Sequence, residues 1–77
     1  GHYKPSPKPY VVDMIDADGV VLRNFKVITS KPELRVTDVR NLRLEQVQIE
    51  VDGGKLKTEL SGEMNDNLVV KDCNFTL

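Results

Sequence analysis

Apolar residues in this chain recur in pairs two positions apart, and a gap of three positions separates one pair from the next. A spacing of two places successive side chains on one face of a β-strand. A gap of three contains one additional residue, which turns the chain and keeps the next apolar side chain on the inner side. Asp-Gly, Lys-Pro and Asp-Gly-Gly sequences punctuate these segments, as is typical of turns. The pattern predicts bent β-strands and no helix.

The pattern occurs three times along the chain. The segments Gly19–Val27, Asn41–Ile49 and Asn67–Phe75 align, with starts 22 and then 26 residues apart. Repeats of this length are typical of solenoids, in which each unit buries its apolar face against the next. We therefore predict an all-β fold, a short right-handed parallel β-helix of about three rungs. Its core would be four columns of stacked side chains: Val20, Leu42 and Leu68; Leu22, Leu44 and Val70; Phe25, Val47 and Cys73; and Val27, Ile49 and Phe75.

The alignment also extends to the residues before each repeated segment. The longer spacing contains four additional residues, which we assign to the surface loop Asp52–Lys55. The upstream apolar columns are then Val12, Leu34 and Leu60; Met14, Val36 and Gly62; and Ala17, Val39 and Asn65. The outer columns are Arg23, Glu45 and Lys71, with alternating charge, and the polar corner Asn24, Gln46 and Asp72.

An antiparallel β-sandwich or meander is the alternative fold, with Asp18-Gly19 as a type I′ hairpin turn. The equivalent Arg40-Asn41 and Asp66-Asn67 pairs form such turns less readily, which favours the parallel arrangement. Residues 1–10 differ from the rest, because their prolines favour extended backbone. We predict that residues 1–10 are a proline-rich leader or linker and that residues 11–77 form the repeat domain.

With the columns aligned, the chain resembles the pectin-lyase-like superfamily, and most closely the repeats of glycoside hydrolase family 28, the polygalacturonase-type enzymes. Val36–Ile49 and Asp18–Val27 carry the resemblance, which extends from about Val11 to Leu77. It implies a right-handed parallel β-helix and a parent protein that acts on pectic polymers. The family's Asn-Thr-Asp, Asp-Asp, Gly-His-Gly and Arg-Ile-Lys motifs are absent here, so no catalytic residue carries over.

Composition narrows the possible functions. The 77 residues carry a net charge of −1, which argues against nucleic-acid binding, since that favours a basic patch. The single cysteine excludes an intrachain disulfide and a multi-cysteine zinc site. No apolar run reaches the ~18 residues of a membrane span. We predict no cofactor, no metal, no nucleic acid and no membrane contact.

Asp13, Asp16 and Asp18 form the densest group of carboxylates. Such a group could bind Ca²⁺ or supply the two carboxyls of a glycosidase. However, Asp13 and Asp16 face opposite sides of a strand unless a bend intervenes, and Asp18 before Gly19 suits a turn. We favour the structural interpretation. His2, the only histidine, lies in the leader with no neighbour to orient it as a base.

The remaining candidate residues have weaker signals. Cys73 occupies an apolar column, so we interpret it as a small buried side chain and not as a nucleophile. Asn74-Phe75-Thr76 matches a glycosylation sequon, with Asn74 expected to point outward; we interpret the match as chance. A small sugar-contacting surface could include Tyr3, Tyr10, Lys4, Lys8 and Lys55, but the low aromatic content gives it little support.

We expect a non-catalytic structural or binding module, a terminal piece of an extracellular or periplasmic carbohydrate-active protein that contacts polysaccharide through its parent. The alternative is a stand-alone interaction domain that self-associates through open β-helix ends. A third hypothesis is an enzyme whose site is shared between chains. The segment Leu68–Leu77 has no visible cap. We therefore expect another chain, in a homodimer, or the rest of a parent protein to cover this rung, because open strand edges template further pairing.

Overall fold

The computed structural model describes residues 8–77, which form six strands and connecting turns without a helix. The prediction of an all-β fold is confirmed. The strands are β1 (Tyr10–Ile15), β2 (Val21–Thr29), β3 (Glu33–Thr37), β4 (Arg40–Val51), β5 (Lys57–Ser61) and β6 (Asp66–Lys71).

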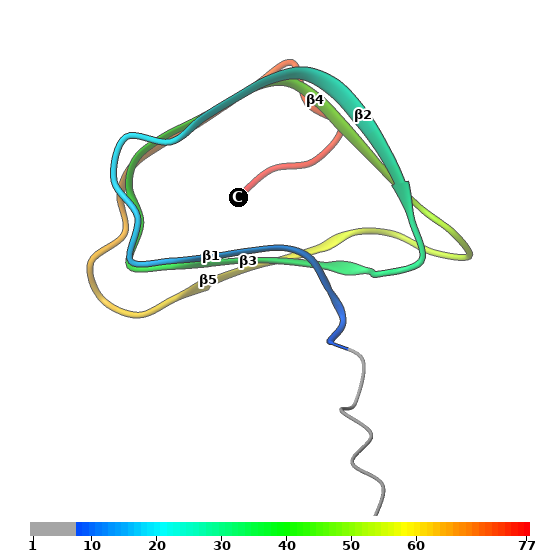
Figure 1. Cartoon of the computed structure of the whole chain (residues 1–77), viewed down its shortest axis with the longest axis horizontal. Helices are drawn as coiled ribbons and strands as arrows, with labels where there is room; N and C mark the ends of the chain where they lie inside the picture. The colour runs from blue at the N-terminus through cyan, green and yellow to red at the C-terminus, as the bar shows by residue number, and fades with distance from the viewer. Residues whose placement is uncertain (1–7) are drawn as a thin grey trace, which may run out of the picture.

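The strands form two parallel sheets, and the chain alternates between them. The first sheet has the order β1-β3-β5 and the second β2-β4-β6, with every named pairing parallel. Figure 1 shows β1, β3 and β5 along one side of the molecule and β2 and β4 along the other. The antiparallel alternative is therefore wrong. Asp18, expected in a hairpin there, instead forms a parallel bridge with Arg40.

Three repeats stack side by side in this arrangement: the first (residues 10–29), the middle (33–51) and the third (57–77). In the second sheet, Leu22 lies opposite Leu44 and Leu44 opposite Val70, in agreement with the sequence alignment. Parallel strands in register place equivalent side chains directly over one another.

The first sheet departs from the predicted register. Leu60 pairs with Val36, and Thr58 pairs with Leu34, so the predicted pairing of Leu60 with Leu34 is wrong by two residues. The four additional residues are divided, two in the loop after β4 and two in the turn after β5. The second insertion is stabilised by the Asp38 carboxylate, which accepts hydrogen bonds from the Glu63 and Met64 amides, both at 3.0 Å.

Residues with positive φ recur at equivalent positions in all three repeats. One set follows β1, β3 and β5 and comprises Asp16, Asp38 and Gly62. A second set comprises Gly19, just before β2, and Asn41 and Asn67, the second residues of β4 and β6. A third set comprises Asn24 within β2, Gln46 within β4 and Asp72 just after β6. Glycine, asparagine and aspartate enter this left-handed region more readily than other residues. The additional residue in the apolar pattern after Leu22 and its equivalents therefore corresponds to a backbone bend.

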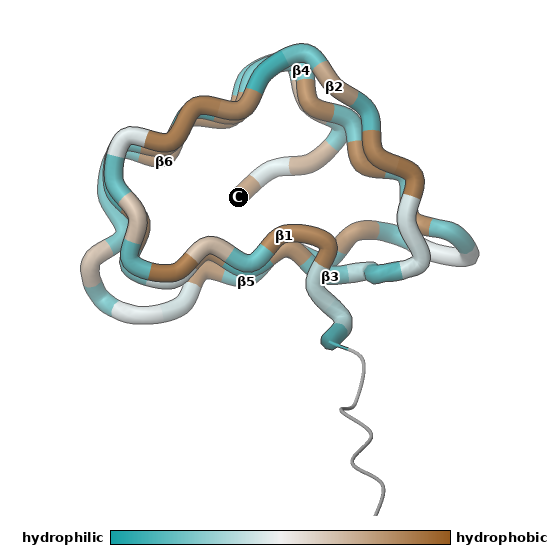
Figure 2. The backbone as a smooth tube through the Cα atoms, in the orientation of Figure 1, coloured by the Kyte–Doolittle hydropathy of each residue, from teal (hydrophilic) through white to brown (hydrophobic). Residues whose placement is uncertain are grey.

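Among residues 8–77, the fully buried core belongs to the middle repeat alone. Its members are Leu34, Val36, Val39, Leu42, Leu44, Val47 and Ile49. Figure 2 shows hydrophobic and hydrophilic residues alternating along the strands. Side chains of the outer repeats are partly buried against this core, among them Val20, Leu22, Leu68, Val70, Cys73 and Phe75. Phe25 was expected in the core but is 37% exposed, because β2 is an edge strand and nothing in residues 8–77 stacks on its outer side. Val27, in the same strand, is half-buried.

Candidate functional site

The C-terminal tail, residues 72–77, covers part of the third-repeat end. β6 ends at Lys71 and pairs only with Arg40–Glu45, so the distal half of β4 has no partner strand on that side within residues 8–77. The expectation that Leu68–Leu77 forms a complete uncapped rung is therefore wrong. The tail turns inward, and Figure 1 shows the C-terminus within the outline traced by the strands.

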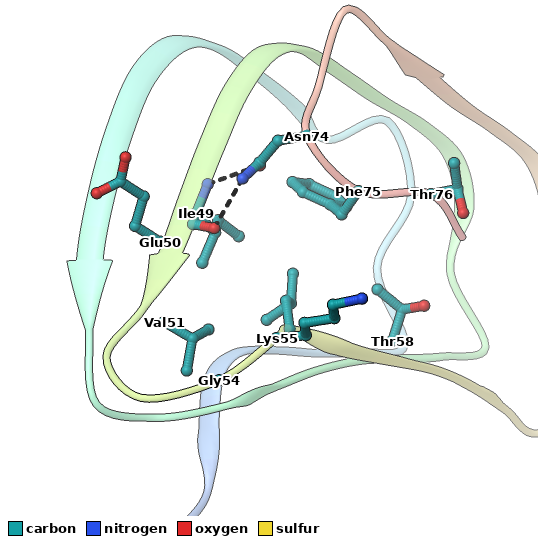
Figure 3. Close-up of a pocket in the computed structure, with 10 residues that line it drawn as sticks. Ile49, Glu50, Val51, Gly54, Lys55, Thr58, Asn74, Phe75 and Thr76 are labelled. Carbon is teal, nitrogen blue, oxygen red and sulfur yellow. Dashed lines mark hydrogen bonds between the residues drawn. The ribbon is translucent and has the colours of Figure 1, made fainter.

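Side chains of the tail bond to the free edge of β4 in place of a strand. The Ile49 amide donates to Asn74 Oδ1 at 2.9 Å, and Asn74 Nδ2 donates to the Ile49 carbonyl, also at 2.9 Å (Figure 3). The Val47 amide donates to Cys73 Sγ at 3.4 Å. A carboxamide offers the same donor and acceptor as a peptide group, so Asn74 substitutes for one residue of the missing strand.

This arrangement corrects the prediction for Asn74. Asn74 was expected to point outward, with the sequon match interpreted as chance, but both polar atoms of its carboxamide are bonded to Ile49. A glycan at Nδ2 would break the bond to the Ile49 carbonyl. Cys73, predicted to be a small buried side chain, is half-buried, and its thiol also donates to the Leu44 carbonyl at 3.4 Å.

A cleft of about 700 Å³ lies between the tail, the end of β4 and the following loop. Its lining includes Ile49, Glu50, Lys55, Thr58 and Phe75 (Figure 3). Glu50 is the one carboxylate in the lining, and its Oε1 lies 2.9 Å from Lys26 Nζ. Glycoside hydrolysis by two carboxylates needs a second one across the bond to be cleaved. Among residues 8–77, the lining of this cleft supplies one carboxylate.

A smaller cleft of about 420 Å³ separates the tail from the third-repeat strands. Leu60, Leu68, Val70, Thr76 and Leu77 line it. The tail thus covers the end of the apolar core incompletely, with Phe75 and Leu77 packed against the core.

At the first-repeat end, β1 and β2 are the edge strands of their sheets. The Asp52 amide donates to the Thr29 carbonyl, so Thr29 and alternate residues before it face β4. The backbone groups of Lys26 and Ile28 face away, where residues 8–77 supply no strand. Apolar side chains accompany this edge: Val21 is 51% exposed and Ile28 73%. An unpaired edge with exposed apolar residues is a template for strand addition.

The outer face of the first sheet carries an ion-paired column. Arg35 donates to both carboxylate oxygens of Asp13, at 3.0 and 2.9 Å, and its guanidinium lies 4.2 Å from the Tyr10 ring centroid. Glu59 is the register partner of Arg35 on β5. The Arg35 hydrogen bonds hold the pKa of the Asp13 carboxyl below its ordinary value. The bonded Asp13 likewise raises the pKa of Arg35.

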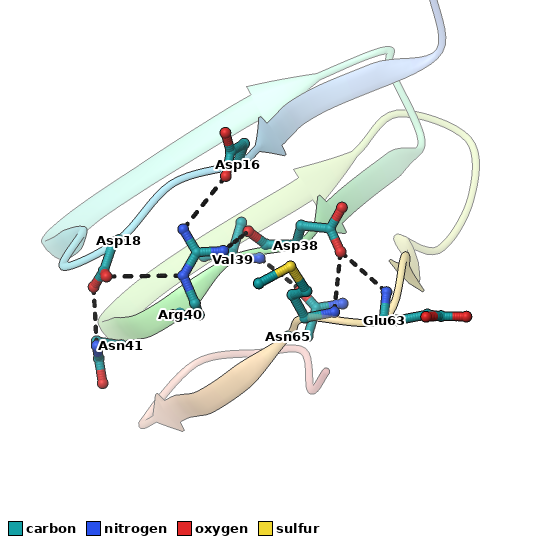
Figure 4. A network of polar contacts seen from close by, with 9 residues as sticks. Asp16, Asp18, Asp38, Val39, Arg40, Asn41, Glu63 and Asn65 are labelled. Atoms are coloured by element: carbon teal, nitrogen blue, oxygen red, sulfur yellow. Dashed lines mark hydrogen bonds and ion pairs between the residues drawn. The ribbon is translucent and has the colours of Figure 1, made fainter.

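Arg40 organises the carboxylates at the bend between the two sheets (Figure 4). It lies 3.3 Å from Asp16 and 3.8 Å from Asp18, and it donates to the Asp38 carbonyl at 3.0 Å. Asp18 also accepts from Asn41 Nδ2 at 2.9 Å. The sequence group of Asp13, Asp16 and Asp18 is therefore divided between two arginines. Among the described residues, no three His, Cys, Asp or Glu side chains are placed to bind a metal.

On the second sheet, Glu45 is the centre of the column predicted from Arg23, Glu45 and Lys71. Arg23 Nη2 lies 2.9 Å from Glu45, and Arg43 Nε lies 2.8 Å from its other oxygen. Lys71 is the register partner of Glu45 on β6. The Arg43 hydrogen bond is the main cause that lowers the pKa of Glu45, with Arg23 adding to it.

The other sequence candidates that the structure describes lie apart from one another. His2, Tyr3 and Lys4 lie outside the described residues. Tyr10, on β1, packs under the guanidinium of Arg35 on β3. Lys55 lines the larger cleft beside the tail. Lys8 is exposed. Residues 8–77 contain no helix long and apolar enough to cross a membrane.

Sequence reasoning missed three polar residues that shape the site: Asp38, Arg40 and Asn65. Asn65 Oδ1 accepts from the Val39 amide at 2.8 Å, and its Nδ2 donates to the Ser61 carbonyl at 2.9 Å. Arg40 could have been found, because it stands in the aligned column immediately before Asn41, opposite Asp18 and Asp66. Asp38, in the bend after β3, and Asn65, in the turn after β5, both stabilise the insertion after β5, which the alignment assigned to the loop after β4.

No protein-family model, curated protein or solved structure matches this chain.

Proposed function

We propose that this chain is a short right-handed parallel β-helix of three rungs that serves as a non-catalytic structural or binding module. Alternation between two parallel sheets, equal register in the second sheet and bends at equivalent positions support this fold. Each rung would contain one strand of each sheet. The middle rung, flanked on both sides, holds the fully buried core.

The difference between the two ends is the observation that carries the function. The tail covers part of the third-repeat end, whereas at the other end residues 8–77 supply no strand that pairs with the outer edge of β1 or of β2. A module with one such end suits the terminal position of a longer β-helix, in which further rungs continue on β1 and β2. Edge pairing would supply the main-chain hydrogen bonds and the exposed apolar side chains of β2 would supply buried area.

The identity of the larger protein rests on the sequence resemblance. Repeats like those of polygalacturonase-type enzymes support a carbohydrate-active, extracellular or periplasmic parent whose catalytic rungs lie outside this chain. The ion pairing of Asp13, Asp16, Asp18 and Glu50 with basic side chains supports the absence of catalysis here. Exposed Val21 and Ile28 also favour the second candidate, a domain that pairs with another copy of itself.

An activity assay tests the non-catalytic part of the proposal. The purified chain, incubated with polygalacturonate, should release no reducing ends, because its clefts lack a pair of unneutralised carboxylates. Turnover that disappears in Asp16→Asn or Asp18→Asn would contradict the proposal. The three-rung fold is tested separately by NMR contacts between Leu22, Leu44 and Val70; contacts between Ile15 and Val20 typical of a hairpin would contradict it.

A further inference from the structure

Three columns of charged residues run across the repeats, and the sign alternates along each. Register partners connect Asp13 to Arg35 and Arg35 to Glu59 in the first sheet. The other two columns, at the bend and in the second sheet, are Asp18, Arg40 and Asp66, and Arg23, Glu45 and Lys71. Ion pairs at 2.9 Å join Asp13 to Arg35 and Arg23 to Glu45, and Arg40 lies 3.8 Å from Asp18.

Because each column has three members, its two outer members carry the same sign. The first repeat presents Asp13, Asp18 and Arg23, which is negative, negative, positive. The third repeat presents the same order in the same columns, as Glu59, Asp66 and Lys71. The middle repeat alone has the opposite order, with Arg35, Arg40 and Glu45.

This sign order disfavours head-to-tail stacking of identical chains. A second copy with its third repeat on β1 and β2 would place Glu59 opposite Asp13, Asp66 opposite Asp18 and Lys71 opposite Arg23. Like charges directly opposite one another on neighbouring strands are destabilising, and all three columns would have them. The exposed apolar residues on β2 favour addition of a strand to its outer edge. The charges of Asp13, Asp18 and Arg23 select which strand can be added.

We infer that the open end pairs with a rung carrying a cation opposite Asp13, a cation opposite Asp18 and an anion opposite Arg23. The inference rests on the proposed function, which makes β1 and β2 the docking edges. The partner is therefore a parallel β-strand unit with the charge order of the middle repeat. The cation opposite Asp13 would bind this carboxylate as Arg35 does within the chain, with two hydrogen bonds to its two oxygens.

An added repeat tests this inference in the full chain. In the matched chain, a duplicate of residues 30–51 is inserted between residues 7 and 8, which keeps the spacing of 22 residues between the first two repeats. In the reversed chain, the duplicate alone carries Arg35→Glu, Arg40→Glu and Glu45→Lys, the sign order that a second copy would bring. A third chain has a flexible Gly/Ser linker of equal length. The readout is NMR amide exchange of Lys26 and Ile28, on the outer edge of β2.

The matched duplicate should slow exchange of these two amides by at least about tenfold relative to the linker chain. The reversed duplicate should protect them about tenfold less than the matched one. Equal protection by both duplicates would overturn the charge selection and leave the proposed docking edge intact. No protection by either would overturn the proposed function itself. Stronger protection by the reversed duplicate would identify a second copy as the occupant and contradict the inference.

Discussion

At the third-repeat end of the molecule, Asn74 and Cys73 bond to the outer edge of β4, and Phe75 packs against the core. At the first-repeat end, the outer edge of β2 has no partner within residues 8–77, and Ile28 is exposed beside it. Both ends are formed by copies of one repeated sequence pattern. The difference shows that a few side chains in a short tail can replace part of a strand at one end, while at the other end residues 8–77 supply no partner for the outer edge of β2.

The largest expected effect is a loss of stability on truncation of a core side chain, which should be greater in the middle repeat than at the ends. Leu44→Ala should reduce the free energy of unfolding by about 2–5 kcal/mol, because its side chain is fully buried and a cavity would remain. Leu22→Ala, in the same column at the open end, should cost clearly less, since one side already contacts solvent. Urea unfolding measures both. Equal losses would mean that the first-repeat end is covered.

Substitution of one glycine in the first repeat and one in the third compares the turns in which they lie. Gly19 and Gly62 have φ of 80° and 79°, but only at Gly62 would a methyl group overlap a neighbouring side chain, the Asp38 carboxylate. Gly19→Ala should cost about 1–2 kcal/mol from backbone strain. Gly62→Ala should cost at least about 1 kcal/mol more, because Asp38 would lose its bonds to the Glu63 and Met64 amides.

Thermal and urea unfolding of the two alanine variants gives the comparison directly. Asp38→Ala serves as the control, since it removes the same hydrogen bonds without altering the glycine. Identical costs at Gly19 and Gly62 would show that Asp38 does not hold the turn after β5.

Removal of the Asn74 carboxamide should make the two ends more alike. Asn74→Leu should cost about 1–2 kcal/mol, because the Ile49 amide and carbonyl lose their partners. Its specific signature is faster exchange of the Ile49 amide. Thr76→Ala, an exposed change in the same tail, is the matched control and should leave that amide protected. Unchanged Ile49 exchange in Asn74→Leu would refute the strand-replacing role.

The smallest effect is a pH dependence. The pKa values of Asp13 and Glu45 are lowered in the folded chain, by hydrogen bonds from Arg35 and from Arg43 and Arg23 respectively. As the pH falls, the unfolded chain therefore binds protons before the folded chain does. The contribution of these two carboxylates to folding stability is present above the ordinary carboxyl pKa and is lost as the pH falls through the lowered pKa. Between about pH 5 and about pH 2, the urea midpoint should decline less steeply in Asp13→Asn than in the wild type. A parallel decline would exclude Asp13 as a contributor.

The second sheet could be predicted from the sequence because its columns are continuous there. Leu22, Leu44 and Val70 are apolar and stand at equal distance from the polar bend, so aligning the repeats also aligns the strands. The Asp13–Arg35 pair follows from the same spacing. The first sheet was harder, because an inserted residue is equally compatible with either loop until the Asp38 contacts fix its place.

The closed end could not be predicted from the sequence for a different reason. Cys73 and Phe75 fit the apolar columns, so the tail reads as one more strand. Its inward turn depends on Asn74 replacing a peptide group, and an asparagine at an outer position gives no sequence signal of that role. The core columns assigned to the third repeat are therefore only partly buried.

Native-state amide exchange by NMR tests the difference between the two ends most directly. The amides of Val47 and Ile49 face the third-repeat end and bond to Cys73 and Asn74, whereas those of Lys26 and Ile28 lie on the outer edge of β2. The first two should exchange slowly, at rates set by opening of the tail, and the last two close to the rate of an unstructured chain. Equal protection of both pairs, or rapid exchange at Ile49, would contradict an end closed by the tail and an end open for pairing.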